Sequence, residues 1–200
     1  MAIGIVDYGA GNLRSVQKAF SFLDMENKVI DDVRDMGGVD RLVLPGVGSF
    51  GHAASQLKKA GFWEPLKAWI KADRPFLGIC LGMQLLFDGS EESAGVAGLG
   101  VFAGSCRRFL ERKSPQIGWN DIVNIRSVCL LQGIAAGSHF YFVHGFHVAA
   151  ESPDIVAAET EYGTFYPSIV GRGRVWAVQF HPEKSGEAGL RLLRNWGERC

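Results

Sequence analysis

Short apolar runs alternate with amphipathic stretches through the first half of the chain. The apolar runs are rich in Val, Ile and Leu, which is typical of strands buried on both faces. The amphipathic stretches repeat apolar residues at helical spacing. The pattern predicts strands at 3–6, 29–30, 41–44 and 76–79, and helices from 13, at 52–60, at 63–72 and from 81. Because strands and helices alternate, we expect parallel pairing with helices on both faces of the sheet.

The second half of the chain has a different pattern, in which strand-like runs follow one another. Strands are predicted at 107–110, 121–126, 139–148, 155–161, 165–171 and 175–180, with a closing amphipathic helix at 185–196. Short glycine turns between several of these runs indicate antiparallel hairpins. We therefore predict one α/β domain over residues 1–200, with a mixed, mostly parallel central sheet flanked by helices and extended by antiparallel strands.

Composition narrows the class of protein. Of 200 residues, 47% are hydrophobic and 21% are charged, and the 21 basic and 21 acidic residues cancel. This balance argues against a general nucleic-acid or anionic-membrane surface. No run approaches the roughly 20 apolar residues of a membrane span, and the N-terminus does not read as a signal peptide. We expect a soluble, cytoplasmic protein that binds neither nucleic acid nor membrane.

The four cysteines are Cys80, Cys106, Cys129 and Cys200. They are scattered and form no C-x-x-C pair, which argues against a disulfide framework and a zinc site and favours a reducing compartment. On the predicted strand 139–148, His144 and His147 lie three residues apart. They are expected to face opposite ways and to be poor joint metal ligands, so no metal is expected.

Cys80 lies at the centre of Gly78-Ile79-Cys80-Leu81-Gly82, between a predicted strand and a predicted helix. Small residues on both sides of a nucleophile are typical of the strand–turn–helix elbow. At a helix N-terminus the thiolate is favoured, and the Leu81 N–H is placed to stabilise an oxyanion. The simpler alternative is a small apolar residue at a buried strand end.

His181 follows the predicted strand 175–180, and Glu183 lies two residues further on. In extended chain the two side chains point to the same side, and Pro182 favours extended geometry at His181. His181 can act as base toward the Cys80 thiol, and Glu183 can orient the imidazole. An exposed His-Pro-Glu turn is the alternative for this segment alone, but the pairing with the elbow favours a catalytic triad.

The loop Pro45-Gly46-Val47-Gly48-Ser49-Phe50-Gly51 matches G-x-G-x-x-G between a strand and a helix. One interpretation is a dinucleotide site, which makes an oxidoreductase the second class of function. However, the match follows a middle strand, and no suitably placed acidic residue follows it. We prefer a loop whose backbone N–H, assigned to Val47, is a second donor to the oxyanion.

Together these segments resemble the class I, triad-type glutamine amidotransferases. The similarity lies in residues 78–84, 179–183 and 45–48, and a narrower similarity to the histidine-biosynthesis branch lies in residues 7–13, 115–120 and 141–144. The resemblance implies a flavodoxin-like fold and no cofactor. It also implies that Cys80 attacks the side-chain amide of L-glutamine and that ammonia is released from a thioester.

The resemblance also implies a set of substrate contacts. Gln84 and Glu92 match positions that hold glutamine, together with backbone near Gly48 and at Gly145 and Phe146. The simpler alternatives are a solvated helix residue for Gln84 and an exposed loop charge for Glu92. The chain departs from the family at Gln116, where many members have His, and at residues 145–147.

Ammonia needs an acceptor site, which this fold does not contain. The resemblance implies a heterodimer with a (β/α)8-barrel cyclase that makes imidazole glycerol phosphate and an aminoimidazole carboxamide ribotide. Asn12 and Trp119 match positions near that interface, although Asn12 could be only an N-cap and Trp119 only core. A glutaminase for another synthase and a non-catalytic binding module remain alternatives. We hypothesise that a backbone flip at Val47 completes the oxyanion hole.

Overall fold

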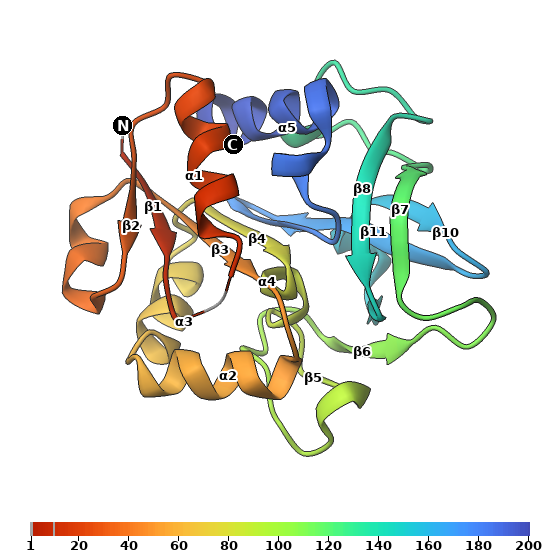
Figure 1. The fold of residues 1–200 in the computed structure, drawn as a ribbon, viewed down its shortest axis with the longest axis horizontal. Coiled ribbons are helices and arrows are strands. Elements are labelled where there is room, and N and C mark those ends of the chain that lie inside the picture. The colour runs from red at the N-terminus through yellow and green to blue at the C-terminus, as the bar shows by residue number, and fades with distance from the viewer. Residues whose placement is uncertain (1, 10) are drawn as a thin grey trace.

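A seven-stranded sheet runs through the centre of the molecule (Figure 1). The computed structural model describes residues 2–9 and 11–200, so Ala10 of the predicted glycine turn at 9–11 lies outside it. Across the sheet the strands are β10 (Val156–Glu161), β11 (Phe165–Arg172), β12 (Val175–Val178), β4 (Phe76–Cys80), β3 (Arg41–Gly46), β1 (Ile3–Val6) and β2 (Asn27–Ile30). The last five pair in parallel and the first two are antiparallel, which confirms the predicted mixed sheet.

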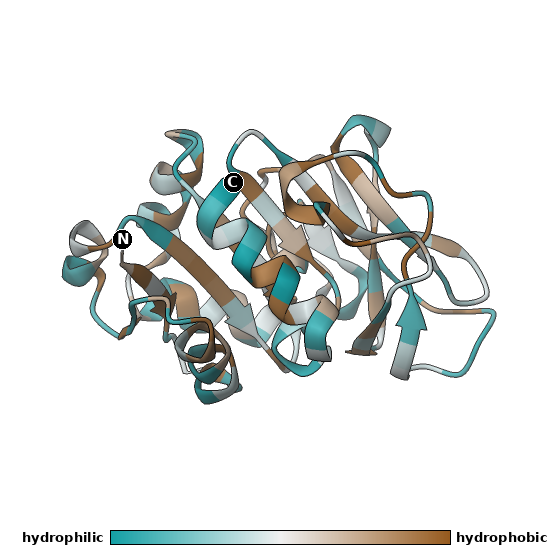
Figure 2. Cartoon of the chain, turned by 90° about the horizontal axis from the view of Figure 1, so that it is seen from above, coloured by the Kyte–Doolittle hydropathy of each residue, from teal (hydrophilic) through white to brown (hydrophobic). Residues whose placement is uncertain are grey.

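Helices cover both faces of this sheet, as the alternating pattern predicted. They are α1 (Leu13–Phe22) and α5 (Gly186–Arg199) on one face and α2 (Phe50–Lys59) and α3 (Trp63–Lys71) on the other. Successive side chains of β3 point to opposite faces of the sheet. Leu42 and Leu44 pack in the cluster with α2 and α3, whereas Val43 packs with α1 and α5. Hydrophilic and hydrophobic residues alternate along α5, the helix that ends at the C-terminus in Figure 2, as expected of a helix with one face on the core. No helix in the described residues is long and apolar enough to cross a membrane.

Two smaller sheets lie beside the central one. One pairs β7 (Gln116–Asp121) with β8 (His139–His144), and the other joins β5 (Gly89–Ser90), β6 (Gly104–Arg108) and β9 (Phe146–Ala150). The predicted single strand at 139–148 is therefore wrong, because the chain leaves one sheet at Gly145 and enters another. The strand predicted at 121–126 is also wrong: the pairing lies earlier, over β7. Because strand-like apolar runs lie on both sides of Gly145, the sequence pattern does not indicate that the strand ends there.

A disulfide joins Cys129 to Cys200, contrary to the expectation from cysteine spacing. Cys129 begins the short 3-10 helix Cys129–Leu131, and Cys200 follows α5. The Asn195 side-chain amide ties the same segments together by donating to the carbonyls of Leu130 at 3.1 Å and Gln132 at 2.8 Å. The two cysteines are 71 residues apart, so only the fold brings them together.

Close backbone contacts hold the turn after β4. A Cβ at Gly82 would lie 1.9 Å from the Leu44 carbonyl oxygen, and one at Gly78 would lie 2.8 Å from the Gly82 carbonyl oxygen. Neither position has room for a side chain. The glycines on each side of Cys80 are therefore required by packing against β3 and across the turn.

Replacement of Gly82 tests this packing. We expect Gly82→Ala to lower the free energy of unfolding by about 3 kcal/mol, because a backbone contact cannot yield as a flexible side chain does. The matched control is Gly37→Ala, where a Cβ meets nothing within 4 Å; it should change stability by less than about 0.5 kcal/mol. The measurement is equilibrium urea unfolding, and equal effects of the two substitutions would contradict the account.

Candidate active site

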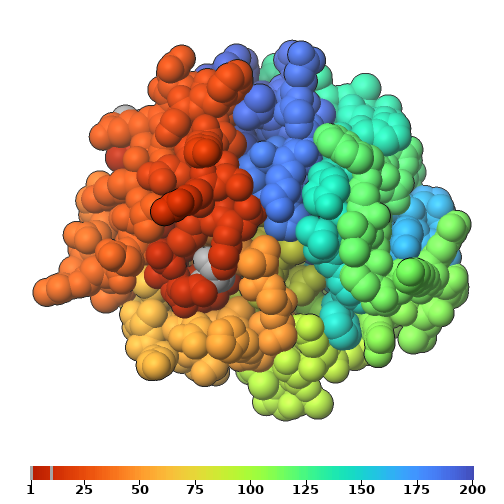
Figure 3. Space-filling model, in the orientation of Figure 1, coloured from red at the N-terminus to blue at the C-terminus, as the bar shows by residue number. Residues whose placement is uncertain are grey.

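The residues predicted to carry the chemistry lie at the carboxyl ends of three neighbouring strands. β4 pairs in parallel with β3 on one side and with β12 on the other, and Gly46 lies opposite Cys80 in the register. The thiol, the loop after β3 and His181 after β12 therefore meet at one edge of the sheet, where parallel α/β sheets bind ligands. In Figure 3 the olive surface of the segment around β4 is recessed between orange, teal and blue surfaces.

Cys80 has an unusual backbone conformation. Its φ of 55° and ψ of −107° are rare for a residue with a side chain, and such strain is found where a site needs it. The four-residue helix α4 (Leu81–Gln84) begins directly after it. The Sγ atom lies 3.9 Å from the Val143 carbonyl oxygen, which the thiol can donate to. The structure thus has the sharp strand-to-helix turn that the glycine pattern predicted.

His181 and Glu183 form a buried pair. Nδ1 of His181 lies 2.7 Å from Oε1 of Glu183, and both side chains are shielded from solvent. His181 is extended, as Pro182 favours, but Glu183 lies in the 3-10 helix Pro182–Lys184 rather than in extended chain. In the described structure Nε2 of His181 makes no hydrogen bond to protein. The ring nitrogen away from Glu183 is therefore free for the thiol and the substrate.

The electrostatic surroundings keep His181 protonated. Burial alone would lower the pKa of His181, but its interactions with the Cys80 sulfur and the Glu183 carboxylate outweigh burial and raise the pKa to about 10. An imidazolium beside a sulfur nucleophile favours the thiolate and holds a proton ready for a leaving group.

Asn12 has a role that its sequence position did not indicate. It occupies the N-cap position of α1, as predicted, in a left-handed conformation with φ of 78°, but its side chain makes no capping hydrogen bond. Instead its amide donates to Oε1 of Glu183 at 2.5 Å and lies 3.4 Å from Nδ1 of His181. Asn12 therefore helps to hold the carboxylate against the imidazole.

A cavity of about 190 Å³ opens beside the Cys80 sulfur. Its lining consists of the residues Val47, Gly48, Cys80, Leu81, Gln84, Glu92, Val143, His144, Gly145 and Phe146. All the residues predicted for the nucleophile, the oxyanion donors and the substrate contacts border this one space. Gly48 has a φ of 102°, which a residue with a side chain would adopt only under strain.

Gln84 and Glu92 enter the site in different ways. Gln84 is buried, so the solvated-helix alternative is wrong; its Nε2 donates to the carbonyls of Phe146 at 2.8 Å and of the Gln179 side chain at 3.1 Å. Glu92 is exposed, but its carboxylate accepts from the Phe50 N–H at 2.6 Å, at the start of α2. Glu92 thereby ties its loop to the loop after β3.

The same contacts argue against a dinucleotide at the G-x-G-x-x-G loop. Phosphates bind at such a loop through free N–H groups at the start of the helix. Here the Phe50 N–H donates to Glu92 and the Gly51 N–H donates to the Ser93 hydroxyl at 3.0 Å. The helix start is occupied by a carboxylate, which repels phosphate.

The structure places two polar residues at the site to which the sequence analysis assigned no role. Gln179 follows β12 and its Nε2 lies 3.7 Å from the Cys80 sulfur. His144 lines the cavity and donates from Nδ1 to the Phe146 carbonyl at 2.8 Å; burial lowers the pKa of His144 to about 3, so it is neutral. A polar residue at the end of an apolar strand was the available signal for Gln179.

The prediction that His144 and His147 face opposite ways is wrong. Their rings lie 5.4 Å and 4.8 Å from the ring of Phe109, and both also contact Tyr166. The break at Gly145 removes the alternation on which the prediction depended. Both rings belong to one aromatic cluster behind the cavity.

Trp119 lies on β7 and is 57% exposed, so the core alternative for this residue is wrong. Its neighbour on the same side of the strand, Ile117, is 64% exposed. The backbone of Trp119 lies opposite that of Tyr141, whose carbonyl accepts the His181 N–H at 2.9 Å. An exposed apolar strand face is thus joined directly to the segment that carries His181.

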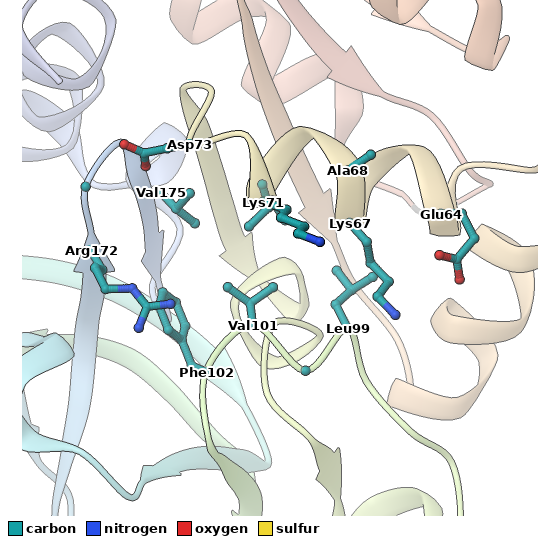
Figure 4. A pocket seen from close by; sticks show the side chains of 13 residues that line it. Glu64, Lys67, Ala68, Lys71, Asp73, Leu99, Val101, Phe102, Arg172 and Val175 are labelled. Carbon is teal, nitrogen blue, oxygen red and sulfur yellow. The ribbon is translucent and has the colours of Figure 1, made fainter.

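A larger cavity lies at the opposite end of the strands (Figure 4). It has a volume of about 740 Å³ and lies between α3, the loop around Val101 and the turn between β11 and β12. Lys67, Lys71 and Arg172 lie around an apolar floor that includes Phe102. Its lining contains carboxylates and amines but no cysteine, serine, threonine or histidine. The smaller space beside Cys80, which has a thiol with a nearby imidazole, is therefore the better candidate for the active site.

Comparisons with known proteins identify the family of the chain. Residues 5–200 match the family Glutamine amidotransferase class-I. A solved structure described as a glutamine amidotransferase superposes with a TM-score of 0.76 at 20% identity, covering 98% of both chains, which shows the shared fold. The chain belongs to the class-I glutamine amidotransferases.

Two curated relatives narrow the family. "Imidazole glycerol phosphate synthase subunit HisH" of Desulfitobacterium hafniense is 46% identical over 98% of this chain and 93% of its own length. The protein of the same name from Methanocaldococcus jannaschii is 45% identical over 98% of each. Within the class-I family the chain is therefore similar to the HisH branch along nearly its whole length.

The buried pair predicts a specific dependence of stability on pH. The pKa of His181 is raised from 6.5 to about 10, so its stabilising effect is complete below pH 6.5 and is lost as the pH rises through about 10. Glu183→Gln should lower the pKa of His181 and flatten this fall. The measurements are imidazole NMR titration and urea unfolding between pH 6.5 and 10. Exposed Glu151→Gln is the control; an unchanged profile in Glu183→Gln would refute the coupling.

The Asn12 contact predicts an effect on turnover rather than on substrate binding. We expect Asn12→Ala to lower kcat for glutamine hydrolysis about 10-fold, as for one hydrogen bond to a charged group, with little change in KM because Asn12 does not line the cavity. Asn124→Ala is the matched control, since Asn124 donates to the Glu159 carboxylate on the surface at 2.8 Å. Equal kcat values for the two variants would remove Asn12 from the mechanism.

Proposed function

We propose that this chain is the glutaminase subunit of an imidazole glycerol phosphate synthase and that Cys80, His181 and Glu183 carry out its chemistry. The observation that carries the proposal is a nucleophilic turn that opens on a cavity, with a buried imidazolium–carboxylate pair beside it. The class-I family hydrolyses the side-chain amide of glutamine, and the similarity to HisH subunits supports a place in histidine biosynthesis.

The first half-reaction forms a thioester. The Cys80 thiolate attacks the amide carbon of glutamine, and the negative oxygen is stabilised by the N–H of Leu81 and that of Val47. The tetrahedral intermediate collapses as His181 donates its proton to the leaving nitrogen, which departs as ammonia. The glutamyl group is then bonded to the Cys80 sulfur.

The second half-reaction releases glutamate. His181, now neutral, takes a proton from water while the water oxygen attacks the thioester carbon. The carbon–sulfur bond breaks, the thiolate is restored and the protonated His181 again lies between Cys80 and Glu183. Glu183 remains ionised throughout and, with Asn12, keeps the imidazole oriented.

Substrate contacts follow from the atoms left free around the cavity. Both N–H groups of the Gln84 side chain are used within the protein, so its Oε1 is the atom available to accept from the substrate. The backbone of Gly48, Gly145 and Phe146 adds donors and acceptors. Glu92 adds a negative charge for the substrate's α-ammonium group.

The ammonia acceptor is assigned to a second chain, a (β/α)8-barrel cyclase that forms a heterodimer with this one. We propose that Trp119 contacts it, because Trp119 and Ile117 are exposed apolar side chains on one strand, which is typical of a protein interface. The family resemblance implies that Asn12 lies near the same interface. Val47 is 39% exposed, and its side chain lies beside Gly11 in the β1–α1 loop. Partner binding there can move the Val47 peptide, which is where we place the activity switch.

The proposed cellular location of the protein is the cytoplasm.

Replacement of the nucleophile tests the proposal. Cys80→Ala should abolish glutamate formation from glutamine while cyclase binding and activity with added ammonia persist. Cys106→Ala, which removes the other free cysteine, is the control and should retain the glutaminase. Turnover in Cys80→Ala would refute the mechanism. Glutamine-dependent product with a different synthase, and none with the cyclase, would favour a glutaminase that serves another amidotransferase.

A further inference from the structure

We infer that Gln179 is a positioning residue that presents an N–H to the Cys80 sulfur and so favours its thiolate form, oriented by a chain of two side-chain amides. The chain starts at the Phe146 carbonyl, passes through Gln84 and ends at the sulfur. This inference rests on the proposed role of Cys80 as nucleophile.

The orientation of Gln84 is set by a group that cannot donate. A backbone carbonyl oxygen only accepts hydrogen bonds, so the atom of Gln84 that faces the Phe146 carbonyl at 2.8 Å must be the nitrogen. His144 holds the same carbonyl from the other side, with its Nδ1 at 2.8 Å. The start of the chain is therefore fixed by two donors on one acceptor.

The orientation of Gln179 follows from that of Gln84. The second N–H of Gln84 points to Gln179, so the Gln179 oxygen must face it, at 3.1 Å. The Gln179 nitrogen then lies on the opposite side, 3.7 Å from the Cys80 sulfur. A reversed amide would place N–H against N–H at one end and a carbonyl oxygen against the sulfur at the other.

Burial makes these contacts effective. Gln179 is 0% exposed and Gln84 is also buried, so water does not compete for their hydrogen bonds. The backbone of Gln179 is held as well, because its N–H donates to the Ser168 carbonyl at 2.9 Å. The amide therefore cannot turn away from the sulfur without leaving a buried polar group unpaired.

The sulfur has one neighbour suited to each protonation state. With a proton on sulfur, the thiol can donate to the Val143 carbonyl at 3.9 Å. Once the proton has moved to His181, that carbonyl has nothing to accept, whereas the Gln179 N–H still donates to the negative sulfur. Hydrogen bonds to a charged atom are stronger than those to a neutral one, so Gln179 stabilises the thiolate selectively.

The rate of alkylation by iodoacetamide measures the thiolate character of Cys80 directly, because the reaction needs neither glutamine nor cyclase. In the full chain, Gln179→Met keeps the size of the side chain and removes the donor. We expect the rate of Cys80 alkylation at pH 7 to fall at least 10-fold, as for one hydrogen bond to a charged group. The rate should return to the wild-type value at high pH, where the sulfur loses its proton without help.

Further variants keep the test decisive. Gln179→Glu keeps the shape, cannot donate when ionised and should lose at least as much rate; Gln84→Met should give a smaller loss, because Gln179 keeps its donor but not its orientation. Gln56→Met, on α2 beside His52, is the control, and Cys80→Ser gives the background from Cys106.

Two results would overturn the inference. One is a rate of Cys80 alkylation equal to that of the wild type at all pH values in both Gln179→Met and Gln84→Met. The other is a loss that persists at high pH, which would indicate a packing role only. Either result leaves the proposed function standing if Cys80→Ala abolishes glutamate formation, so the two failures are distinguishable.

Discussion

The contact between Gly82 and the Leu44 carbonyl holds the turn on which the site depends. It lets the first turn of α4 lie directly against β3, immediately after the positive φ of Cys80. Because of that turn, the thiol lies at the edge of the sheet with a helix start behind it. Leu81, the proposed oxyanion donor, and the buried Gln84 follow in the same short helix.

The charged groups form a second layer of organisation around this turn. His181 and Glu183 are buried together, and a buried pair is stable only when its remaining polar atoms find partners. Asn12 adds a second donor to Oε1 of Glu183, the oxygen that also faces His181, while within the described residues Oε2 of Glu183 and Nε2 of His181 have no protein partner. The carboxylate raises the pKa of His181, and the protonated ring then favours a negative sulfur. The segments that follow β1, β4 and β12 thus meet in the proposed proton-transfer unit.

Local motifs predicted most of the residues that meet at the candidate site, because their geometry is set by neighbours in the chain. The glycines around Cys80 and the His-Pro-Glu segment carry their geometry in a few consecutive residues. The break at Gly145, the Cys129–Cys200 disulfide and the shared cluster of His144 and His147 could not be predicted in this way. Each depends on which distant strand or helix lies alongside, and an uninterrupted apolar run carries no such information.

The central claim is that the Cys80 sulfur forms a covalent bond to the substrate. It is tested most directly by quenching the enzyme with acid during glutamine turnover and analysing its peptides by mass spectrometry. The account predicts one glutamyl group on the peptide that contains Cys80, absent without glutamine and absent in Cys80→Ala. A glutamyl group on a different residue, or turnover with no adduct at any quench time, would contradict it.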